Sequence, residues 1–184
     1  MARRFFVFDN VDRFVCGTVG TPGQRTFFLQ AVAGPRVVSV QLEKVQVQVL
    51  AQRMGQILLE LERRGVADVA KVVEAAADDE RPLDEPLRDE FGVGTLTIGW
   101  DTDDSVLVLE ARSESEEEPD EEEVDDDAAD GPDVMRVRLS ASQAAGFVKR
   151  ASRVLSSGRP PCPFCGQPLN PEGHICPRTN GYLN

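Results

Sequence analysis

Three cysteines and the only histidine of the chain fall within 15 residues near the C-terminus. They form the two pairs Cys162-x-x-Cys165 and His174-x-Cys176. Two residues between thiols let both sulfurs reach one ion, and Gly166 lets the backbone turn tightly after the first pair. Three cysteines and a histidine are a standard structural zinc set, and thiolates favour zinc over magnesium or calcium. The sequence therefore predicts a zinc knuckle with one structural Zn²⁺ per chain, held by Cys162, Cys165, His174 and Cys176.

Two other uses of these cysteines are less suited to the sequence. A redox Cys-x-x-Cys opens a helix in a βαβ unit, whereas this one lies in a proline-rich tail. An iron–sulfur cluster fits poorly with the histidine and the tight spacing. Four protein ligands close a zinc ion to water and substrate, which argues against catalysis by the metal. With His174 as a ligand, no imidazole remains for a serine or cysteine nucleophile. The fourth cysteine, Cys16, lies in a predicted strand and is expected to pack in the core.

The residues after the last metal ligand form a candidate partner-binding surface. Arg178, Asn180 and Tyr182 follow Cys176 closely, and Tyr182 is the only tyrosine of the chain. Arginine and aromatic residues are common at the energetic centres of protein interfaces. Terminal residues are often poorly ordered, and these three side chains could also dock on the helix predicted at 140–155. Both alternatives stay open beside the partner-binding interpretation.

Acidic charge is concentrated in one segment. The formal net charge is −12, but residues 114–130 alone hold 12 acidic residues and no basic one. The remaining 20 acidic residues balance the 20 lysines and arginines. Such a segment repels itself and has little apolar surface to bury, so we expect a disordered acidic loop at about 113–132. It is either a solvated insertion or a decoy for a basic partner.

The first half of the chain has the pattern of strands followed by a helix. Phe- and Val-rich runs at 4–8, 13–19, 25–32 and 36–42 are separated by short turns, which predicts an antiparallel meander. A helix is predicted at 43–64, where apolar residues recur with a helical period. Its expected buried stripe consists of Val45, Val49, Leu50, Met54, Ile57, Leu58 and Leu61.

The second half repeats this pattern. Strands are predicted at 93–100, 105–111 and 134–139, and Ser140 with Gln143 forms a capping box that begins a helix. Val40-x-Leu42-x-x-x-Gln46 recurs at an offset of 97 residues as 137–143. This is either the usual appearance of a strand entering a helix or an internal duplication. The predicted fold class is α+β, with antiparallel meanders covered by two amphipathic helices.

The sequence thus divides into an α+β body at 1–157 and a zinc knuckle at 158–184. No apolar run approaches the length of about 18 residues that a membrane helix requires. The apolar run after Arg3 and Arg4 ends after four residues, short of the ~7–15 of a signal peptide. We therefore expect a cytoplasmic protein without a membrane contact.

The tail resembles a known family. It carries Gly-Arg-Pro-Pro-Cys-Pro-Phe-Cys-Gly at 158–166 and Pro-x-Gly-His-x-Cys-Pro-Arg-x-Asn-Gly-Tyr at 171–182. These motifs, with the Phe-rich first strands and the glutamine-containing helix entry, resemble the actinobacterial domain-of-unknown-function family 3090. The resemblance implies an actinobacterial cytoplasmic protein with these elements in this order, and it lends no activity.

Three functions fit the sequence, in order of preference. The first is a zinc-binding, non-enzymatic interaction or adaptor protein whose knuckle meets a protein partner. The second is a nucleic-acid-binding zinc ribbon, favoured by Lys149, Arg150, Arg153, Arg159 and Arg178 near the knuckle but disfavoured by the acidic segment. The third is an enzyme acting through carboxylates and arginines of the body. The identity of the partner and the oligomeric state do not follow from the sequence.

Overall fold

The computed structural model describes residues 3–115, 131–158, 161–167, 169, 176 and 178. Within these residues the chain forms seven strands and three helices, which confirms the predicted α+β class. The elements follow one another as β1 (Phe5–Phe8), β2 (Arg13–Val19), β3 (Thr26–Ala33), β4 (Arg36–Leu42), α1 (Lys44–Arg63), α2 (Val69–Ala75), β5 (Asp89–Asp101), β6 (Val106–Ser113), β7 (Val134–Leu139) and α3 (Ala141–Ser156).

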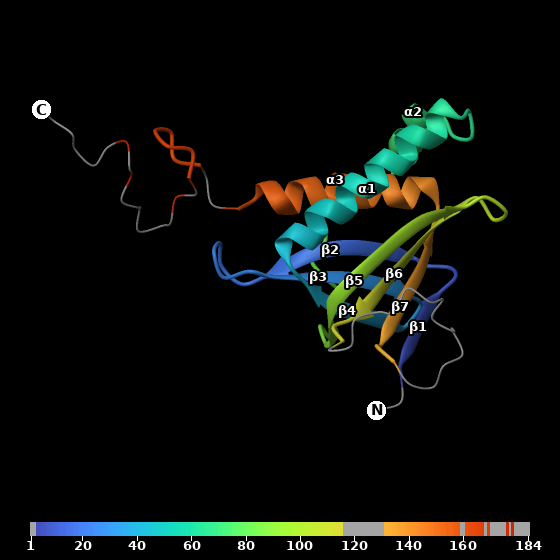
Figure 1. Ribbon diagram of the computed structural model, residues 1–184, viewed down its shortest axis with the longest axis horizontal. Helices are drawn as coiled ribbons and strands as arrows, with labels where there is room; N and C mark the ends of the chain where they lie inside the picture. Colours follow the sequence, from blue (N-terminus) through green and yellow to red (C-terminus); the bar gives the residue numbers. More distant parts are fainter. Residues whose placement is uncertain are drawn as a thin grey trace, which may run out of the picture.

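All described strands belong to one sheet, in the order β1-β7-β6-β5-β4-β3-β2. Two antiparallel meanders, β2-β3-β4 and β5-β6-β7, lie side by side in it, as the sequence predicts. They are joined where β4 pairs in parallel with β5. The sequence indicates antiparallel pairing throughout, so this parallel seam is an addition to the predicted meanders. It converts two small sheets into a single strongly twisted one (Figure 1).

The first strand does not join the first meander, and this part of the prediction is wrong. β1 pairs in parallel with β7, with Phe6 opposite Met135. Only four residues connect β1 to β2, so the Cα atoms of Phe8 and Arg13 can be no more than about 18 Å apart. The two edge strands of the sheet, β1 and β2, must therefore lie close together. Val11 in this connection is buried, so the chain crosses between the edges and does not turn back as a hairpin.

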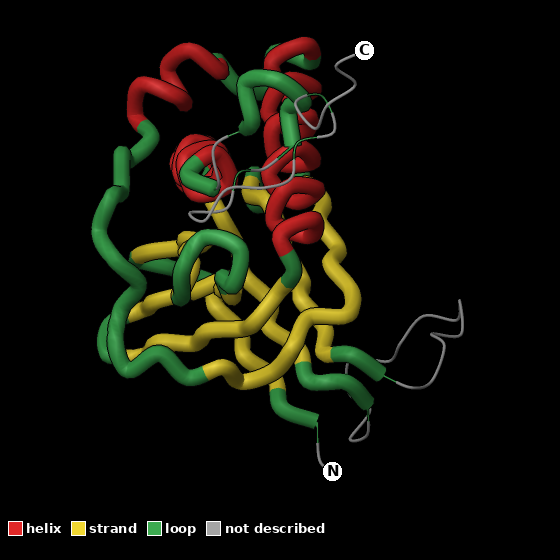
Figure 2. Tube along the Cα trace, turned by 90° about the vertical axis from the view of Figure 1, so that its left-hand side faces the viewer, coloured by secondary structure: helices red, strands yellow, loops and turns green. Residues whose placement is uncertain are grey.

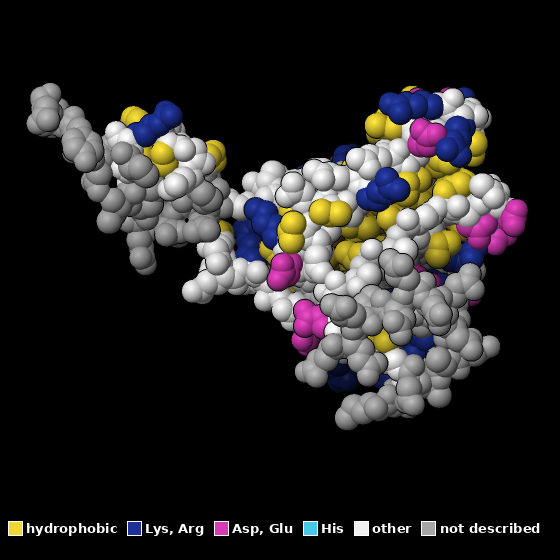
Figure 3. Space-filling view, viewed as in Figure 1, with side chains coloured by type: hydrophobic (Ala, Val, Ile, Leu, Met, Phe, Trp, Pro, Cys, Tyr) yellow, Lys and Arg dark blue, Asp and Glu magenta, His cyan; other side chains and the backbone are white. Residues whose placement is uncertain are grey.

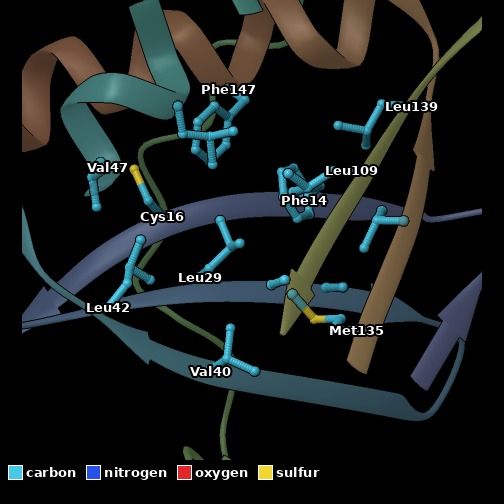
Figure 4. Close-up of a cluster of buried hydrophobic side chains, with 14 of the residues drawn as sticks. Phe14, Cys16, Leu29, Val40, Leu42, Val47, Leu109, Met135, Leu139 and Phe147 are labelled. Carbon is cyan, nitrogen blue, oxygen red and sulfur yellow. The ribbon is translucent and has the colours of Figure 1, made fainter. Parts of the chain in front are cut away.

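Helices α1 and α3 cover one face of the sheet (Figures 1 and 2). Their apolar side chains point toward the strands, as Val47 of α1 and Phe147 of α3 show in Figure 4. The ring of Phe147 stacks on Phe14 of β2 with centroids 5.1 Å apart. The fully buried centre of this layer also includes Leu29, Val40, Leu107, Leu109, Met135, Val137 and Leu139. The core is therefore shared by both halves of the chain.

The buried face of α1 differs from the prediction at its start. Val45 and Val49 are more than half exposed, whereas Val47 is fully buried. The buried residues are Val47, Leu50, Ala51, Met54, Leu58 and Leu61, which follow the i, i+3, i+4, i+7 spacing of one helical stripe. Burying Val45 and Val49 as well would require the sheet to cover a wider face of α1 than it does.

The two long helices begin in the same way. In each, a glutamine at the third position accepts a hydrogen bond from the backbone N–H of the capping residue, Glu43 or Ser140. The amide of Gln46 also donates to the carbonyl of Val93, 2.8 Å away. That of Gln143 donates to the carbonyl of Val11, at 2.7 Å. Each capping glutamine thus binds the other half of the chain near its first meander strand.

The two halves also match in the order of their elements, and the question of an internal duplication stays open. Apart from the additional strand β1, both halves run strand, strand, strand, helix, and corresponding strands point in the same direction because β4 is parallel to β5. The matching glutamines, 97 residues apart in the sequence, make matching contacts. Any strand that enters a helix can have such a cap, but the second hydrogen bond of each glutamine, to the other half of the chain, is not part of the cap.

The opposite face of β2 and β3 is covered by residues 77–88, which come after α2. Leu83 lies against Gly17, where an added Cβ would come within 2.7 Å of the leucine Cγ. Gln30 is fully buried and bonds to both backbone groups of Asp84, donating at 3.0 Å and accepting at 2.8 Å. This segment therefore gives the first meander a second packed face.

Residues 116–130 lie outside the residues that the structure describes, so the predicted disorder of the acidic segment is not tested. Their flanks are fixed by β6 and β7. No helix in the described part of the chain is both long and apolar enough to cross a membrane.

Gly17→Ala should lower the free energy of unfolding by about 1–3 kcal/mol, because the new methyl group overlaps Leu83. Gly99→Ala in β5 is the matched control, since nothing lies within 4 Å of an added Cβ there. Denaturant unfolding measures both. Leu83→Ala should restore part of the loss when combined with Gly17→Ala, and an additive double mutant would show that this packing is wrong.

Candidate metal centre

The cysteine cluster comes after α3, which ends at Ser157, where the backbone N–H donates a hydrogen bond to the carbonyl of Arg153. In Figure 1 it lies beyond the end of α3, away from the sheet. Two backbone hydrogen bonds close its first loop. The N–H of Gly166 donates to the carbonyl of Cys162 at 2.8 Å, and the N–H of Cys162 donates to the carbonyl of Gln167 at 2.7 Å. Gly166 has a φ of +75°, a left-handed conformation that glycine adopts without strain. The predicted role of this glycine is thus confirmed.

The loop brings three thiols to one point. The Sγ atoms of Cys162, Cys165 and Cys176 all lie within 4.8 Å of one another. Those of Cys162 and Cys176 are 3.9 Å apart. Sulfurs bound tetrahedrally to one zinc at ~2.3 Å would be about 3.8 Å apart, so this pair already has the spacing that such an ion requires. Cys162 and Cys176 are buried, and Cys165 is partly exposed. The three cysteines fit a metal ion.

The protonation of Cys165 depends on its neighbours in the cluster. A hydrogen bond from the Gln167 backbone lowers the pKa of the Cys165 thiol, as expected for an amide that points at a sulfur. Loss of water and the contacts with Cys176 and Cys162 outweigh this effect, and the pKa of Cys165 is raised. A positive charge beside this sulfur would oppose the rise and favour the thiolate.

The structure describes only some of the other predicted site residues. The fourth ligand, His174, lies outside the described residues, as do Asn180 and Tyr182 of the candidate partner surface. Arg178 is described, and it is exposed. Phe164, which lies between Cys162 and Cys165, was not among the predicted site residues, and it is 59% exposed. Its exposure could have been predicted, because so short a Cys-x-x-Cys turn has no hydrophobic core in which to bury an aromatic side chain.

Residues 6–176 match the family described as protein of unknown function DUF3090. The chain belongs to this family. The match spans the body and reaches the last cysteine of the cluster, so the three cysteines lie in the region that characterises the family. No curated protein and no solved structure matches the chain.

The fourth cysteine has the environment predicted for a core residue. Cys16 is fully buried in β2. Burial raises the pKa of its thiol to about 11, although the nearby Arg150 lowers it. A thiol with this pKa remains protonated at neutral pH and is a poor nucleophile.

A group of charged side chains, which the sequence did not reveal, surrounds Asp79. Arg13 of β2 and Arg150 of α3 are each only 7% exposed. Arg13 binds the Asp79 carboxylate with two nitrogens, at 2.6 and 3.1 Å. Arg150 donates to the Asp79 carbonyl at 2.7 Å and to its carboxylate at 3.2 Å. Arg13 also pairs with Asp84. We call these residues, together with Arg81, the arginine–aspartate cluster.

The cluster fixes the charge state of its central acid. Hydrogen bonds from Arg13, together with bonds from Arg81, hold the pKa of Asp79 well below its usual range, although burial opposes this. Asp79 is therefore ionised at all ordinary pH values and does not serve as a general acid.

Protonation of Asp79 should destabilise the fold. Because the pKa of Asp79 is depressed in the folded state, its stabilising effect is complete above the ordinary aspartate pKa of about 3.9 and is lost as the pH falls below that value. Asp79→Asn should lower the free energy of unfolding at neutral pH by about 3–5 kcal/mol, since it leaves two buried arginines without their shared carboxylate.

Denaturant unfolding between about pH 7 and pH 3 measures both effects. The loss of stability on acidification should be smaller in Asp79→Asn than in the parent protein. Asp68→Asn, which removes an exposed cap and ion pair of α2, is the control. Equal acid sensitivity of Asp79→Asn and the parent would contradict the role of this carboxylate.

Proposed function

We propose that this DUF3090 protein is a zinc-binding, non-enzymatic interaction protein of the cytoplasm. Zinc is held by Cys162, Cys165 and Cys176 with His174 as the fourth ligand, and it folds the C-terminal segment into a recognition surface for a protein partner. The meeting of three thiols within 4.8 Å carries the proposal.

The chemistry of the donor set supports zinc as the metal. Three sulfurs exclude the hard cations that prefer oxygen, and a histidine nitrogen completes a tetrahedral set. Zinc in such a set has no open position, so its contribution is structural. All four ligands fall within 15 residues of sequence. A loop this short gains its fold from the metal, because it is too small to bury a core of its own.

The exposed side chains around the cluster support recognition. Phe164 is largely exposed although it is apolar, and Arg178 is exposed two residues after the last cysteine. Figure 3 shows hydrophobic and basic side chains next to one another on the described part of this tail. An exposed aromatic residue held on a rigid turn loses little conformational entropy when it enters a partner's pocket. With Asn180 and Tyr182, these residues form the proposed contact surface.

Metal content provides the first test. Purified protein should contain one zinc per chain by elemental analysis, and Cys162→Ser or Cys176→Ser should release it. Cys16→Ala, which removes a cysteine outside the cluster, should retain the zinc. His174→Ala should weaken zinc binding without abolishing it, since three thiolates remain. Iron in place of zinc, or zinc retained by both serine variants, would refute the assignment.

Loss of zinc should unfold the tail and spare the body. The metal ligands lie beyond α3, so the melting temperature of the body should change by less than about 4 °C in Cys162→Ser, equivalent to under ~1 kcal/mol. Amide hydrogen exchange should rise in residues 161–178 and remain unchanged in the sheet. A large fall in the melting temperature would show that the knuckle supports the body.

Partner binding provides the second test. A partner cross-linked in the native host and identified by mass spectrometry should rebind to purified protein. The double variant Phe164→Ala with Arg178→Ala should weaken this binding at least about tenfold, with zinc content and melting temperature unchanged. Arg88→Ala, an arginine of the body outside the knuckle, is the control. Binding of single-stranded RNA that weakens steeply with salt and depends on the same two residues would favour the nucleic-acid function instead.

A further inference from the structure

A cavity of about 200 Å³ lies in the body, between the start of β2, the chain after α2 and the first half of α3. Phe14 and Phe147 form part of its wall, with Ala75 and Ala77 from the covering chain. The polar side chains that line it are Asp12, Arg13, Asp79, Arg81, Ser142, Gln143 and Arg150. The lining thus combines apolar side chains with charged groups from the arginine–aspartate cluster.

One nitrogen of Arg150 has no hydrogen-bond acceptor. The guanidinium is held by Nε, which donates to the carbonyl of Cys16 at 2.6 Å, and by Nη1, which donates to Asp79. Within the described part of the chain, Nη2 has no acceptor at all, although the residue is only 7% exposed. The two N–H groups of a buried guanidinium nitrogen are costly to leave unbonded. Nη2 itself is not fully buried, so a small molecule can reach it.

The neighbouring arginine shows that this lack of acceptors is not general. All three nitrogens of Arg13 have acceptors, on Asp79, Asp84 and the carbonyls of residues 81 and 82. Within the described residues, every guanidinium nitrogen of Arg13 thus has a hydrogen-bond acceptor, whereas only two of the three nitrogens of Arg150 have one.

Three carboxylates and three guanidinium groups lie around the cavity, but they are paired unevenly. Asp79 is shared by Arg13, Arg81 and Arg150, so one carboxylate serves three guanidinium groups. Asp84 compensates Arg13 alone. The carboxylate of Asp12 accepts a hydrogen bond from the backbone N–H of Gly34 at 2.7 Å. Burial lowers the pKa of Arg150 and the charge of Arg13 lowers it further, whereas the carboxylate of Asp79 raises it.

We propose that this cavity binds a small organic monocarboxylate. One carboxylate oxygen accepts hydrogen bonds from Nη2 of Arg150, and the exposed Arg81 at the edge of the cavity adds a second positive charge. The apolar part of the ligand lies against Phe14, Phe147 and Ala77. An anion with a short apolar chain suits both the charged and the apolar side chains of the lining, whereas inorganic phosphate would place its other oxygens against the phenyl rings.

Butyrate is the probe, and butyramide is its neutral counterpart of nearly the same shape. Isothermal titration and thermal unfolding of the full chain should show butyrate binding in the millimolar range expected for so small a ligand. Butyramide and inorganic phosphate should bind at least about tenfold more weakly, because neither combines the charge with the apolar chain.

Three variants locate the site. Arg150→Lys keeps a positive charge but removes Nη2, and it should weaken butyrate binding at least about tenfold. Ala75→Leu, at an exposed position on the cavity wall, should block entry without disturbing the core, so it decides the question if Arg150→Lys folds poorly. Arg88→Ala, outside the cavity, should bind butyrate like the parent.

Two results would overturn the proposal. The first is equal binding of butyrate and butyramide, or no binding of either at tens of millimolar. The second is butyrate binding that Ala75→Leu leaves unchanged, which would place the anion elsewhere on the protein. Neither result depends on the zinc content or on the partner of the knuckle, so the proposed function is tested separately.

Discussion

The carboxylate of Asp79 receives hydrogen bonds from three arginines that belong to three different parts of the fold. Arg13 comes from β2, Arg150 from α3, and Arg81 from the covering chain itself. Removing this charge would leave two nearly buried guanidinium groups to repel each other, a situation that costs several kcal/mol in proteins. The contact therefore holds residues 77–88 on the sheet, positions α3 against β2 and shapes the cavity between them. With Gln30 and Leu83, it gives the first meander its second covered face.

The two halves of the body depend on each other through their helix caps. Gln46 binds the carbonyl of Val93, and Gln143 binds that of Val11, so each helix start is completed by the opposite half. Neither half is thus a closed unit, which agrees with their union in a single sheet. The halves differ in the segment that comes after each long helix. The chain after α1 supplies Asp79, whereas the chain after α3 leads to the cysteines.

Equivalent positions in the two halves consequently have different environments. Arg53 and Arg150 are separated by the same 97 residues as the two capping glutamines. Arg53 lies on the exposed side of α1 and bonds to Gln56, one turn away on the same helix. Arg150 is buried and reaches Asp79 and Cys16. Two similar strand–helix units therefore place one arginine beside a charged cavity and the other on the surface.

The features that the sequence predicted well are local ones. The three clustered cysteines span 15 residues, the capping box at Ser140 spans four, and the strand at 13–19 needed only its own Phe, Val and Cys residues. The parallel seam between β4 and β5 and the pairing of β1 with β7 depend on contacts across the whole chain. Arg13 and Asp79 are 66 residues apart, and no periodicity marks them as partners. The buried face of α1 was predicted wrongly at Val45. The spacing of apolar residues indicates a helix, but it does not show how wide a face of that helix the sheet covers.

This contrast between local and distant contacts also separates the two candidate sites physically. The cysteine cluster is built from one short segment, so an ion bound by its thiols would order it with little help from the sheet. The cavity is built from β2, α3 and the chain between α2 and β5, so it exists only when the body is folded and Asp79 is ionised. On these proposals, a chelator would act on the first site and acid on the second through the body. The two proposed sites therefore rest on different chemistry and are joined in one chain by the end of α3.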